Sequence, residues 1–249
     1  MLKVMLIAGI RAVFRQTHKK MVKVEAGMNE AVFFDLDKTI SAVPTEKYFA
    51  YHLFKKNIIS TMDFIKVIWQ CLMYDLHFTR DFYAVKSNVI RIVMRDQCAV
   101  QMKDVYREYF HNFLRGMIFP QMLMEIKRHR LENRRLVIIS ASLDFIVEEF
   151  CAYLDIDHFY ASNLEIVNER YTGETLGKIY MGRTKHDAVK EYAEIHNVDL
   201  SRSYAYGDYA EDSHILRMVG FPVAVNPDKK LLSEAVKYNW EIQNCQLSA

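Results

Sequence analysis

Acidic side chains stand at two places where they could act together as a nucleophile and as metal ligands. Asp35 and Asp37 directly follow the apolar residues 31–34, and Asp208 and Asp212 follow a second apolar segment far along the chain. Carboxylates that point the same way repel one another unless a cation lies between them. Oxygen ligands without His or Cys favour Mg²⁺ over Zn²⁺. The sequence therefore predicts a magnesium site built from aspartates.

A hydroxyl and an ammonium group complete a set that could bind a phosphate. Ser140 follows the apolar residues 136–139, and Lys185 stands near the start of an expected helix. Such groups can hold the oxygens of a transferring phosphoryl group while an aspartate attacks the phosphorus atom. Each piece alone has an ordinary explanation, such as a helix cap or a solvated charge. Their common position at strand ends favours phosphoryl transfer.

The elements that must position these residues alternate between strand and helix. Helical periodicity dominates about ninety residues after the first strand. Helices are also expected at about 143–154 and at 184–196, the latter with Thr184 as its N-cap. Residues 165–176 predict a hairpin with turn residues Asn168 and Thr172-Gly173. The expected strands are residues 31–36, 136–140, 158–162, 203–206 and 221–225.

This alternation predicts an α/β fold, a doubly wound and mainly parallel sheet with an inserted all-helical cap. In such a sheet, ligands collect at the carboxyl ends of the strands, which is where the polar residues stand. We expect residues 30–40 and 131–249 to form the catalytic core and residues 41–130 to form the cap. Residues 1–29 form a basic leader that the core is expected not to need.

Charge is distributed unevenly along the chain. Counting Lys and Arg against Asp and Glu gives +5 for residues 1–29, −2 for 30–40, +6 for 41–130 and −7 for 131–249. A basic middle segment between acidic flanks indicates an anionic substrate or surface. Solvated helix faces are the alternative explanation.

Composition and cysteine use exclude several classes of protein. The 249 residues are 51% hydrophobic and 26% charged, as in an ordinary globular chain. The four cysteines are isolated, which argues against a zinc site or a disulfide scaffold and predicts a reducing cytoplasm. No apolar run approaches the roughly 18 residues of a membrane-spanning helix. We expect a cytoplasmic protein without a nucleic-acid partner, and leave open a peripheral membrane contact through residues 1–29.

The residues singled out above fall into four motifs that resemble those of a known family. They are FFDLDKT at 33–39, IIS at 138–140, TK at 184–185 and YGDYAED at 206–212, with further similarity in AVNPDKKL at 224–231. The chain resembles the haloacid dehalogenase (HAD) superfamily, in the phosphoserine phosphatase-like branch whose helical cap follows the first strand. The resemblance covers residues 30–249.

The resemblance implies a role for each motif residue. Asp35 is similar to the nucleophile of the family, which forms an aspartyl-phosphate, and Asp37 is similar to its general acid/base. Thr39 would support the loop that carries Asp37 and belong to the substrate-binding set. Ser140 and Lys185 would hold the phosphoryl oxygens. The implied ligands of Mg²⁺ are Asp35, the backbone carbonyl of Asp37, Asp208 and Asp212.

Three positions depart from the family pattern. Tyr209 stands where a small residue is usual, and Lys38 replaces the commonest glycine. Pro44 stands where phosphoserine phosphatases place the glutamate that binds the ammonium group of the substrate, and the nearest acid is Glu46. Phosphoserine is therefore not the expected substrate.

The expected cap must supply specificity, because its helices would close over the cleft. Arg91 and Arg95 lie one helical turn apart and are the expected substrate-binding cations. Other candidates in the cap are Lys86, Phe78, Phe82 and Tyr83. Together they favour an anionic or partly apolar substrate over an amino acid.

The predicted function is Mg²⁺-dependent hydrolysis of a phosphate monoester, either a small phosphorylated metabolite or a lipid phosphate. A response-regulator receiver also combines aspartates, a hydroxyl and a lysine. It has no cap, and its acidic pair precedes the hydroxyl and the lysine. A non-catalytic phospholigand-binding or membrane-surface protein of the same fold is the second alternative, supported by Tyr209 and the basic leader.

Overall fold

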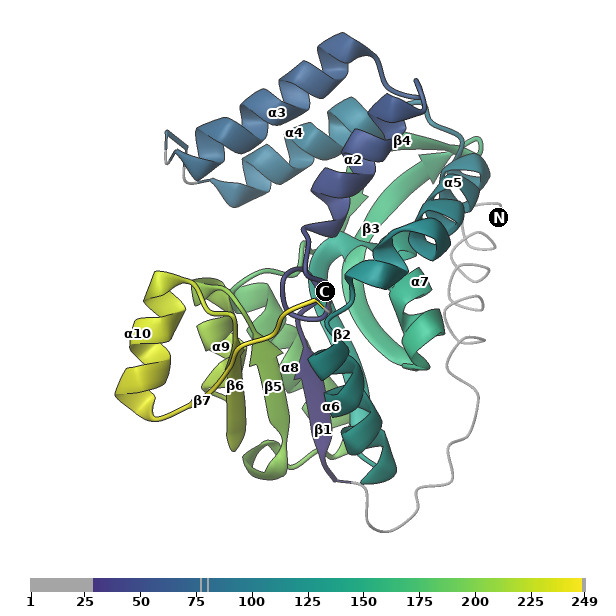
Figure 1. The fold of residues 1–249 in the computed structure, drawn as a ribbon. Coiled ribbons are helices and arrows are strands. Elements are labelled where there is room, and N and C mark those ends of the chain that lie inside the picture. The colour runs from purple at the N-terminus through teal and green to yellow at the C-terminus, as the bar shows by residue number, and fades with distance from the viewer. Residues whose placement is uncertain (1–28, 77, 80, 248–249) are drawn as a thin grey trace, which may run out of the picture.

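A computed structural model describes residues 29–76, 78–79 and 81–247 (Figure 1). Nearly all of the predicted leader, residues 1–28, lies outside these described residues. None of the helices in the described part of the chain combines the length and the apolar character that a membrane crossing requires.

The described residues form one seven-stranded sheet in the order β4-β3-β2-β1-β5-β6-β7. Neighbouring strands are parallel except for the antiparallel pair β3 and β4. The predicted α/β class is therefore confirmed. The strands are β1 (Ala31–Phe34), β2 (Arg135–Leu143), β3 (His158–Val167), β4 (Arg170–Leu176), β5 (Tyr204–Gly207), β6 (Phe221–Val225) and β7 (Glu241–Gln243).

Helices cover both faces of the sheet, because β1 is apolar on both sides. Val32 and Phe34 face a core that includes residues of α6 (Pro120–Leu131) and α7 (Asp144–Leu154). Ala31 and Phe33 face the opposite core, against α8 (Arg183–His196), α9 (Ser213–Leu216) and α10 (Lys229–Tyr238). A continuous apolar strand is typical of a parallel sheet that is buried on both faces.

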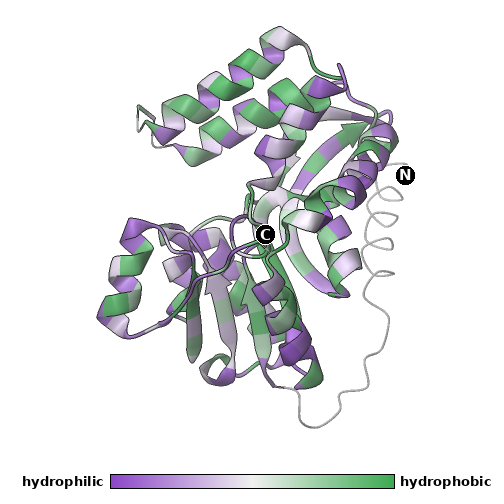
Figure 2. Cartoon of the chain, viewed as in Figure 1, coloured by the Kyte–Doolittle hydropathy of each residue, from purple (hydrophilic) through white to green (hydrophobic). Residues whose placement is uncertain are grey.

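Four further helices stand beyond the carboxyl ends of the strands (Figure 1). They are α2 (Thr45–Lys55), α3 (Thr61–Asp75), α4 (Phe82–Met94) and α5 (Ala99–Asn112). Figure 2 shows apolar residues in the strands and also along α3, whose Ile65 and Trp69 are exposed. The division into core and cap stays a prediction. The helix α6 belongs to the predicted cap range but packs against β2.

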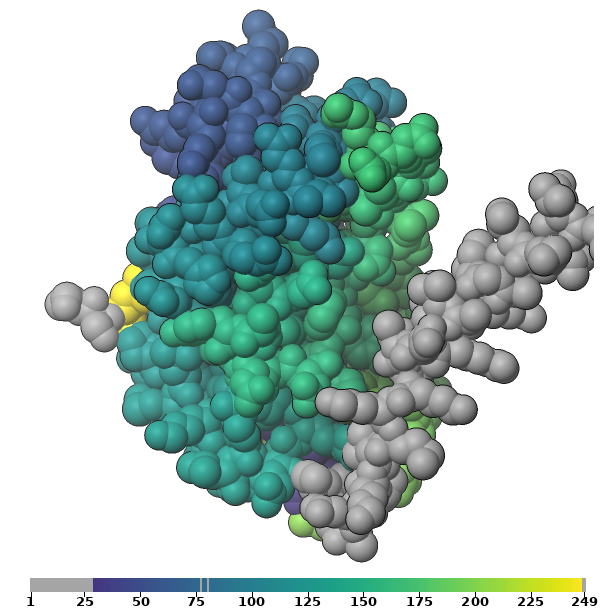
Figure 3. All heavy atoms as spheres, turned by 90° about the vertical axis from the view of Figure 1, so that its right-hand side faces the viewer, coloured from purple at the N-terminus to yellow at the C-terminus, as the bar shows by residue number. Residues whose placement is uncertain are grey.

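The hairpin of β3 and β4 contacts the helical segment, which is the part of the chain from α2 to α5. Asp96 donates its backbone N–H to the carbonyl of Tyr171 (2.9 Å), and Ala99 donates to Glu169 (2.9 Å). Figure 3 shows the surfaces of the two regions meeting, blue to teal for the helices and green for the hairpin. The helical segment is therefore attached to the sheet through this hairpin as well as through its own two ends.

The predicted hairpin and its turn residue Asn168 are confirmed. Two local predictions are wrong, the turn at Thr172-Gly173 and the N-cap at Thr184. The hairpin turns at Asn168 and Glu169, with φ of 50° and 63°, and Gly173 lies inside β4 with φ of 85°. A Cβ on Gly173 would lie 3.1 Å from the Cα of Arg91, so this glycine allows β4 to approach α4 closely. Thr184 lies inside α8, after the N-cap Gly182, and its hydroxyl donates to the carbonyl of Ile179 (2.6 Å).

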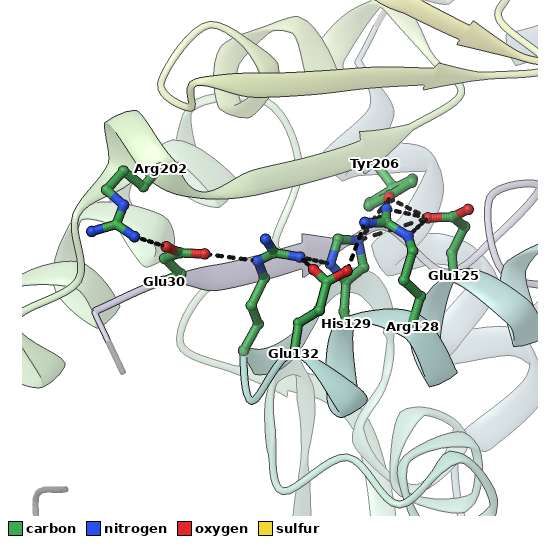
Figure 4. Close-up of polar contacts among 8 residues, drawn as sticks. Glu30, Glu125, Arg128, His129, Glu132, Arg202 and Tyr206 are labelled. Atoms are coloured by element: carbon green, nitrogen blue, oxygen red, sulfur yellow. Dashed lines mark hydrogen bonds and ion pairs between the residues drawn. The ribbon is translucent and has the colours of Figure 1, made fainter. Parts of the chain in front are cut away.

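A buried histidine of α6 lies within a network of charged residues (Figure 4). His129 is fully buried, and its Nε2 lies 2.8 Å from the hydroxyl of Tyr206 on β5. That hydroxyl in turn donates to Glu125 (3.0 Å), and Arg134 lies 3.0 Å from Nδ1 of the histidine. Burial, and then the positive charges of Arg128 and Arg134, lower the pKa of His129 to about 3. The histidine is therefore neutral in the folded protein over most of the acidic range.

This histidine makes the stability depend on pH. Because the unfolded chain protonates near pH 6.5 and the folded chain only near 3, the free energy of unfolding should fall as the pH drops between these values. The expected contribution is about 1 kcal/mol per pH unit. Urea unfolding of wild type and His129→Gln between pH 4.5 and 7.5 measures it. Equal pH slopes for the two proteins would contradict the assignment.

Candidate active site

The strand ends bring most of the predicted site residues to one cavity of about 320 Å³. It lies between the carboxyl ends of the strands and the helices α2, α3 and α4, and each of these elements contributes to its lining. The predicted residues that line it are Asp35, Asp37, Ser140, Lys185, Asp208 and Asp212. Residues separated by as many as 177 positions therefore meet at one edge of the sheet, as expected for a doubly wound fold.

Lys185 links the two ends of this set. It is buried in the first turn of α8, and its Nζ donates to Asp35 Oδ1 (2.5 Å) and to Asp212 Oδ1 (2.7 Å). Burial alone would lower the pKa of Lys185, but the charges of Asp212 and Asp35 outweigh it and raise this pKa. The lysine therefore stays charged and offers an ammonium group at the floor of the cavity.

Three buried carboxylates surround this floor. One oxygen from each of Asp35, Asp208 and Asp212 lies within 4.8 Å of the other two. Burial raises the pKa of Asp35 to about 7, Lys185 opposes this shift, and Asp212 adds to it. Burial, Asp35 and Asp212 raise the pKa of Asp208 to about 9. Without further positive charge, the cluster therefore resists full ionisation.

The donor set fits a hard divalent cation. All three groups are carboxylates, one after β1 and two in the loop after β5, and a cation among them would relieve both their repulsion and their desolvation. Lys185 supplies only one positive charge to the three groups. The cluster could therefore hold a metal ion, as the sequence predicted.

The loop after β5 is built around Asp212. Its Oδ2 accepts the backbone N–H groups of Asp208 and Tyr209, both at 3.2 Å. A Cβ on Gly207 would lie 2.5 Å from the Cβ of Asp212, so only glycine lets the strand end pass this close. The loop thus fixes Asp208 and Asp212 on one side of the cavity.

Tyr209 takes part in this loop without entering the carboxylate cluster. Its side chain is 38% exposed, and it lines the cavity together with Tyr74 of α3. It therefore lies at the rim of the cavity, between the loop after β5 and the helical segment.

Both oxygens of Asp37 have hydrogen-bond donors. Oδ1 accepts the backbone N–H of Thr45 (2.8 Å), the first residue of α2, and Oδ2 accepts the hydroxyl of Ser142 (3.1 Å). We did not predict either contact. The spacing of Ser140 and Ser142 was a usable signal, since residues two apart on a strand share a face.

The structure does not bring Arg91, Arg95 or Thr39 to the cavity lining. Arg91 pairs with Glu174 of β4 through two hydrogen bonds (3.0 and 3.2 Å), and Arg95 lies against Gly173. At about 100° per residue, α4 turns these arginines away from the side that carries Phe82 and Lys86 into the cavity. Thr39 is fully buried, and its hydroxyl lies 3.5 Å from Asp208 Oδ1.

Other predicted cap residues are divided between the cavity and the surface. Lys86 and Phe82 line the cavity, and Lys86 forms a buried ion pair with Glu46, which also lines it. Tyr83 donates its hydroxyl to the carbonyl of Met181 (3.3 Å), and Phe78 is 76% exposed.

Comparison with known proteins identifies the family to which this site belongs. The model of the haloacid dehalogenase-like hydrolases matches residues 32–217, about three quarters of the chain. The chain belongs to the haloacid dehalogenase-like hydrolases. The predicted resemblance is therefore confirmed, and this match covers all the motif residues from Asp35 to Asp212.

Curated relatives support the same family. The "Inhibition of morphological differentiation protein" of Streptomyces azureus is 30% identical over 85% of this chain and 77% of its own length. The histidinol-phosphatase of Neisseria meningitidis is 23% identical over 87% of this chain and 99% of its own length. Together with the family match, such relatives confirm the prediction of a HAD-type phosphatase.

A solved structure confirms the fold. The phospho-aspartyl intermediate analogue of phosphoserine phosphatase has a TM-score of 0.65 and 16% sequence identity to this hydrolase. The match covers 87% of this chain and 93% of that chain.

Removing the central lysine tests the electrostatics of this hydrolase's cavity without an activity assay. In the presence of a chelator, we expect Lys185→Met to lose about 3 kcal/mol of unfolding free energy, since buried carboxylates lose their partner. Lys190→Met, on the exposed side of the same helix, should change it by less than about 0.5 kcal/mol. Urea unfolding compares them. A loss no greater for Lys185→Met than for the control would refute the view that the ammonium group holds the cluster together.

Proposed function

We propose that this HAD-like hydrolase cleaves phosphate monoesters through a covalent aspartyl-phosphate on Asp35 and requires Mg²⁺. The observation that carries the proposal is the contact of Lys185 with Asp35 and Asp212 beside a cluster of three buried carboxylates that opens into a cavity. A carboxylate, an ammonium group and a cation site at one point are the parts that phosphoryl transfer needs. The solved structure of a phosphoserine phosphatase intermediate analogue, which shares the fold, supports this choice of reaction.

In the first step, an oxygen of Asp35 attacks the phosphorus atom, and the bond from phosphorus to the leaving oxygen breaks. Asp37 donates the proton that the leaving alkoxide needs. Lys185 and Ser140, both in the cavity lining, hold the phosphoryl oxygens during the transfer. In the second step, Asp37 takes a proton from water, which attacks phosphorus, releases phosphate and restores the Asp35 carboxylate.

The proposed Mg²⁺ ligands are Asp35, Asp208 and Asp212, with the backbone carbonyl of Asp37. When bound, the ion supplies positive charge that offsets the charges of the phosphoryl group and the carboxylates. Thr39 lies behind this set, where its hydroxyl faces Asp208. In our proposal it therefore supports a metal ligand, and it does not bind the substrate.

The leaving group would meet a wall that is mainly apolar. Ala50, Val67, Val85 and Val89 line the cavity together with the Glu46–Lys86 ion pair. Glu46 forms an ion pair with Lys86 and accepts a hydrogen bond from the backbone N–H of Leu143 (3.0 Å). It is therefore poorly placed to bind a substrate ammonium group. We therefore favour a small, partly apolar metabolite phosphate, with a lipid phosphate as the second candidate. A substrate panel with and without vesicles distinguishes them.

The non-catalytic alternative receives less support from these contacts. Tyr209 was the departure that favoured it, and this side chain lies at the rim while its backbone N–H supports Asp212. The basic leader, the other support for a membrane-surface role, lies mainly outside the described residues.

The nucleophile is tested by Asp35→Asn. We expect the rate on an aryl phosphate with Mg²⁺ to fall by about a thousandfold or more, because an amide does not form the acyl-phosphate. Asp63→Asn, on exposed α3, serves as a control and should retain the wild-type rate. Activity of Asp35→Asn within tenfold of wild type would exclude the proposed nucleophile.

The metal site is tested by Asp208→Ala. Mg²⁺ that binds only the folded protein should raise the Tm of the wild type, and it should raise the Tm of this variant much less. Half-maximal activity should also need at least about tenfold more Mg²⁺. Asp187→Ala, an exposed change on α8, should behave as wild type. The assignment fails if Mg²⁺ stabilises Asp208→Ala as strongly as it stabilises the wild type.

A further inference from the structure

The acid/base candidate Asp37 is held at two points by residues outside the four motifs. One donor is the backbone N–H of Thr45 at the start of α2, and the other is the hydroxyl of Ser142 near the end of β2. These donors approach different oxygens, Oδ1 and Oδ2. Two donors on separate oxygens restrict rotation of the carboxyl group far more than one donor would.

The hydroxyl of Ser142 has few alternatives. Ser142 is 1% exposed, and its Oγ lies 3.1 Å from Asp37 Oδ2 and 3.3 Å from the hydroxyl of Thr45. A hydroxyl has one proton, and an ionised carboxylate only accepts hydrogen bonds. When Asp37 is ionised, the form that acts as the base, Ser142 therefore gives its proton to Asp37 and accepts the proton of Thr45. In this series of hydrogen bonds, the hydroxyl of Thr45 points to Ser142 and the hydroxyl of Ser142 points to the carboxylate of Asp37.

The backbone at Ser142 is itself held by two further hydrogen bonds. The backbone N–H of Ser142 donates to Ser140 Oγ (3.1 Å), and that of Leu143 donates to Glu46 Oε1 (3.0 Å). The pairing of β2 with β3 shifts register between Ile139 and Leu143, and such irregularities commonly redirect side chains next to functional sites. Ser142 is therefore placed by backbone contacts that do not depend on its own hydroxyl.

We propose that Ser142 is a positioning residue that aims Asp37 at the leaving-group oxygen and at the hydrolytic water. The proposal rests on the function proposed above, in which Asp37 is the acid and the base. Ser142 acts through Asp37 and does not itself touch the reacting atoms. Thr45 supports it from the other side of the same carboxylate.

The test uses two substrates that differ in their need for an acid. An alkyl phosphate needs a proton on its leaving oxygen, whereas 4-nitrophenyl phosphate has a stable leaving group and hardly needs one. With Ser142→Ala, kcat/KM should fall by about 10- to 100-fold on the alkyl ester and by less than about threefold on the aryl ester. Acid quenching should also trap more phosphoenzyme than in wild type, because the water is activated poorly.

Three variants control for loss of a buried hydroxyl. Ser162→Ala removes a buried hydroxyl that donates to the carbonyl of Ala141 (2.7 Å), and it should not change the ratio of the two kcat/KM values. Ser142→Thr keeps the hydroxyl and should restore most of the alkyl phosphatase activity. If Ser142→Ala does not fold, as judged by thermal unfolding, Ser142→Cys keeps the volume with a weaker donor and should show the same selective loss.

The outcomes separate this inference from the proposed function. A wild type that hydrolyses neither ester with Mg²⁺ would overturn the proposed function itself. If the wild type is active, two results would overturn the positioning role alone. One is an equal loss of kcat/KM on both esters in the folded Ser142→Ala or Ser142→Cys variant, and the other is no loss in that variant. Combining Ser142→Ala with Asp37→Asn should add little to the loss caused by Asp37→Asn, and additive losses would also contradict the role.

Discussion

The ion pair network of Lys185 is the constraint on which the arrangement of this protein depends. An ammonium group buried between Asp35 and Asp212 is costly unless both partners stay in place. The three residues come from the end of β1, the first turn of α8 and the loop after β5. Pairing β1 directly with β5, and starting α8 at the same edge of the sheet, satisfies that constraint.

The rest of the fold keeps these ends from moving. The side chains of β1 are fully buried on both faces, and the backbone N–H of Asp35 continues the ladder to the carbonyl of Tyr206 (3.0 Å). Tyr206 in turn packs on Phe34 and contacts the neutral His129 of α6. A rigid apolar layer thus supports a polar edge, which is what precise placement of charged groups requires.

Much of the cavity could be predicted because its residues follow apolar runs, and parallel strands end at a common edge. The orientation of Arg91 and Arg95 could not, although their shared face is evident from spacing. The helix α4 is buried on more than one side, so periodicity does not tell which side meets the cavity. Gly173 was misassigned because a glycine in a turn and a glycine at a close approach look the same in sequence. Ser142 was missed because its partner Asp37 is 105 residues away.

The position of β1 in the sheet also affects how the chain acquires its structure. This strand lies at the centre of the sheet, yet it precedes both of its neighbours, β2 and β5, in the sequence. Even the hydroxyl that binds its first backbone N–H belongs to Ser203, 172 residues later. At synthesis rates of roughly 5–20 residues per second, about 10 to 35 seconds pass between the synthesis of residues 31–34 and the synthesis of the neighbouring strand β5. A newly made chain therefore exposes its most buried strand for much of its synthesis, and chaperones have that long to bind it.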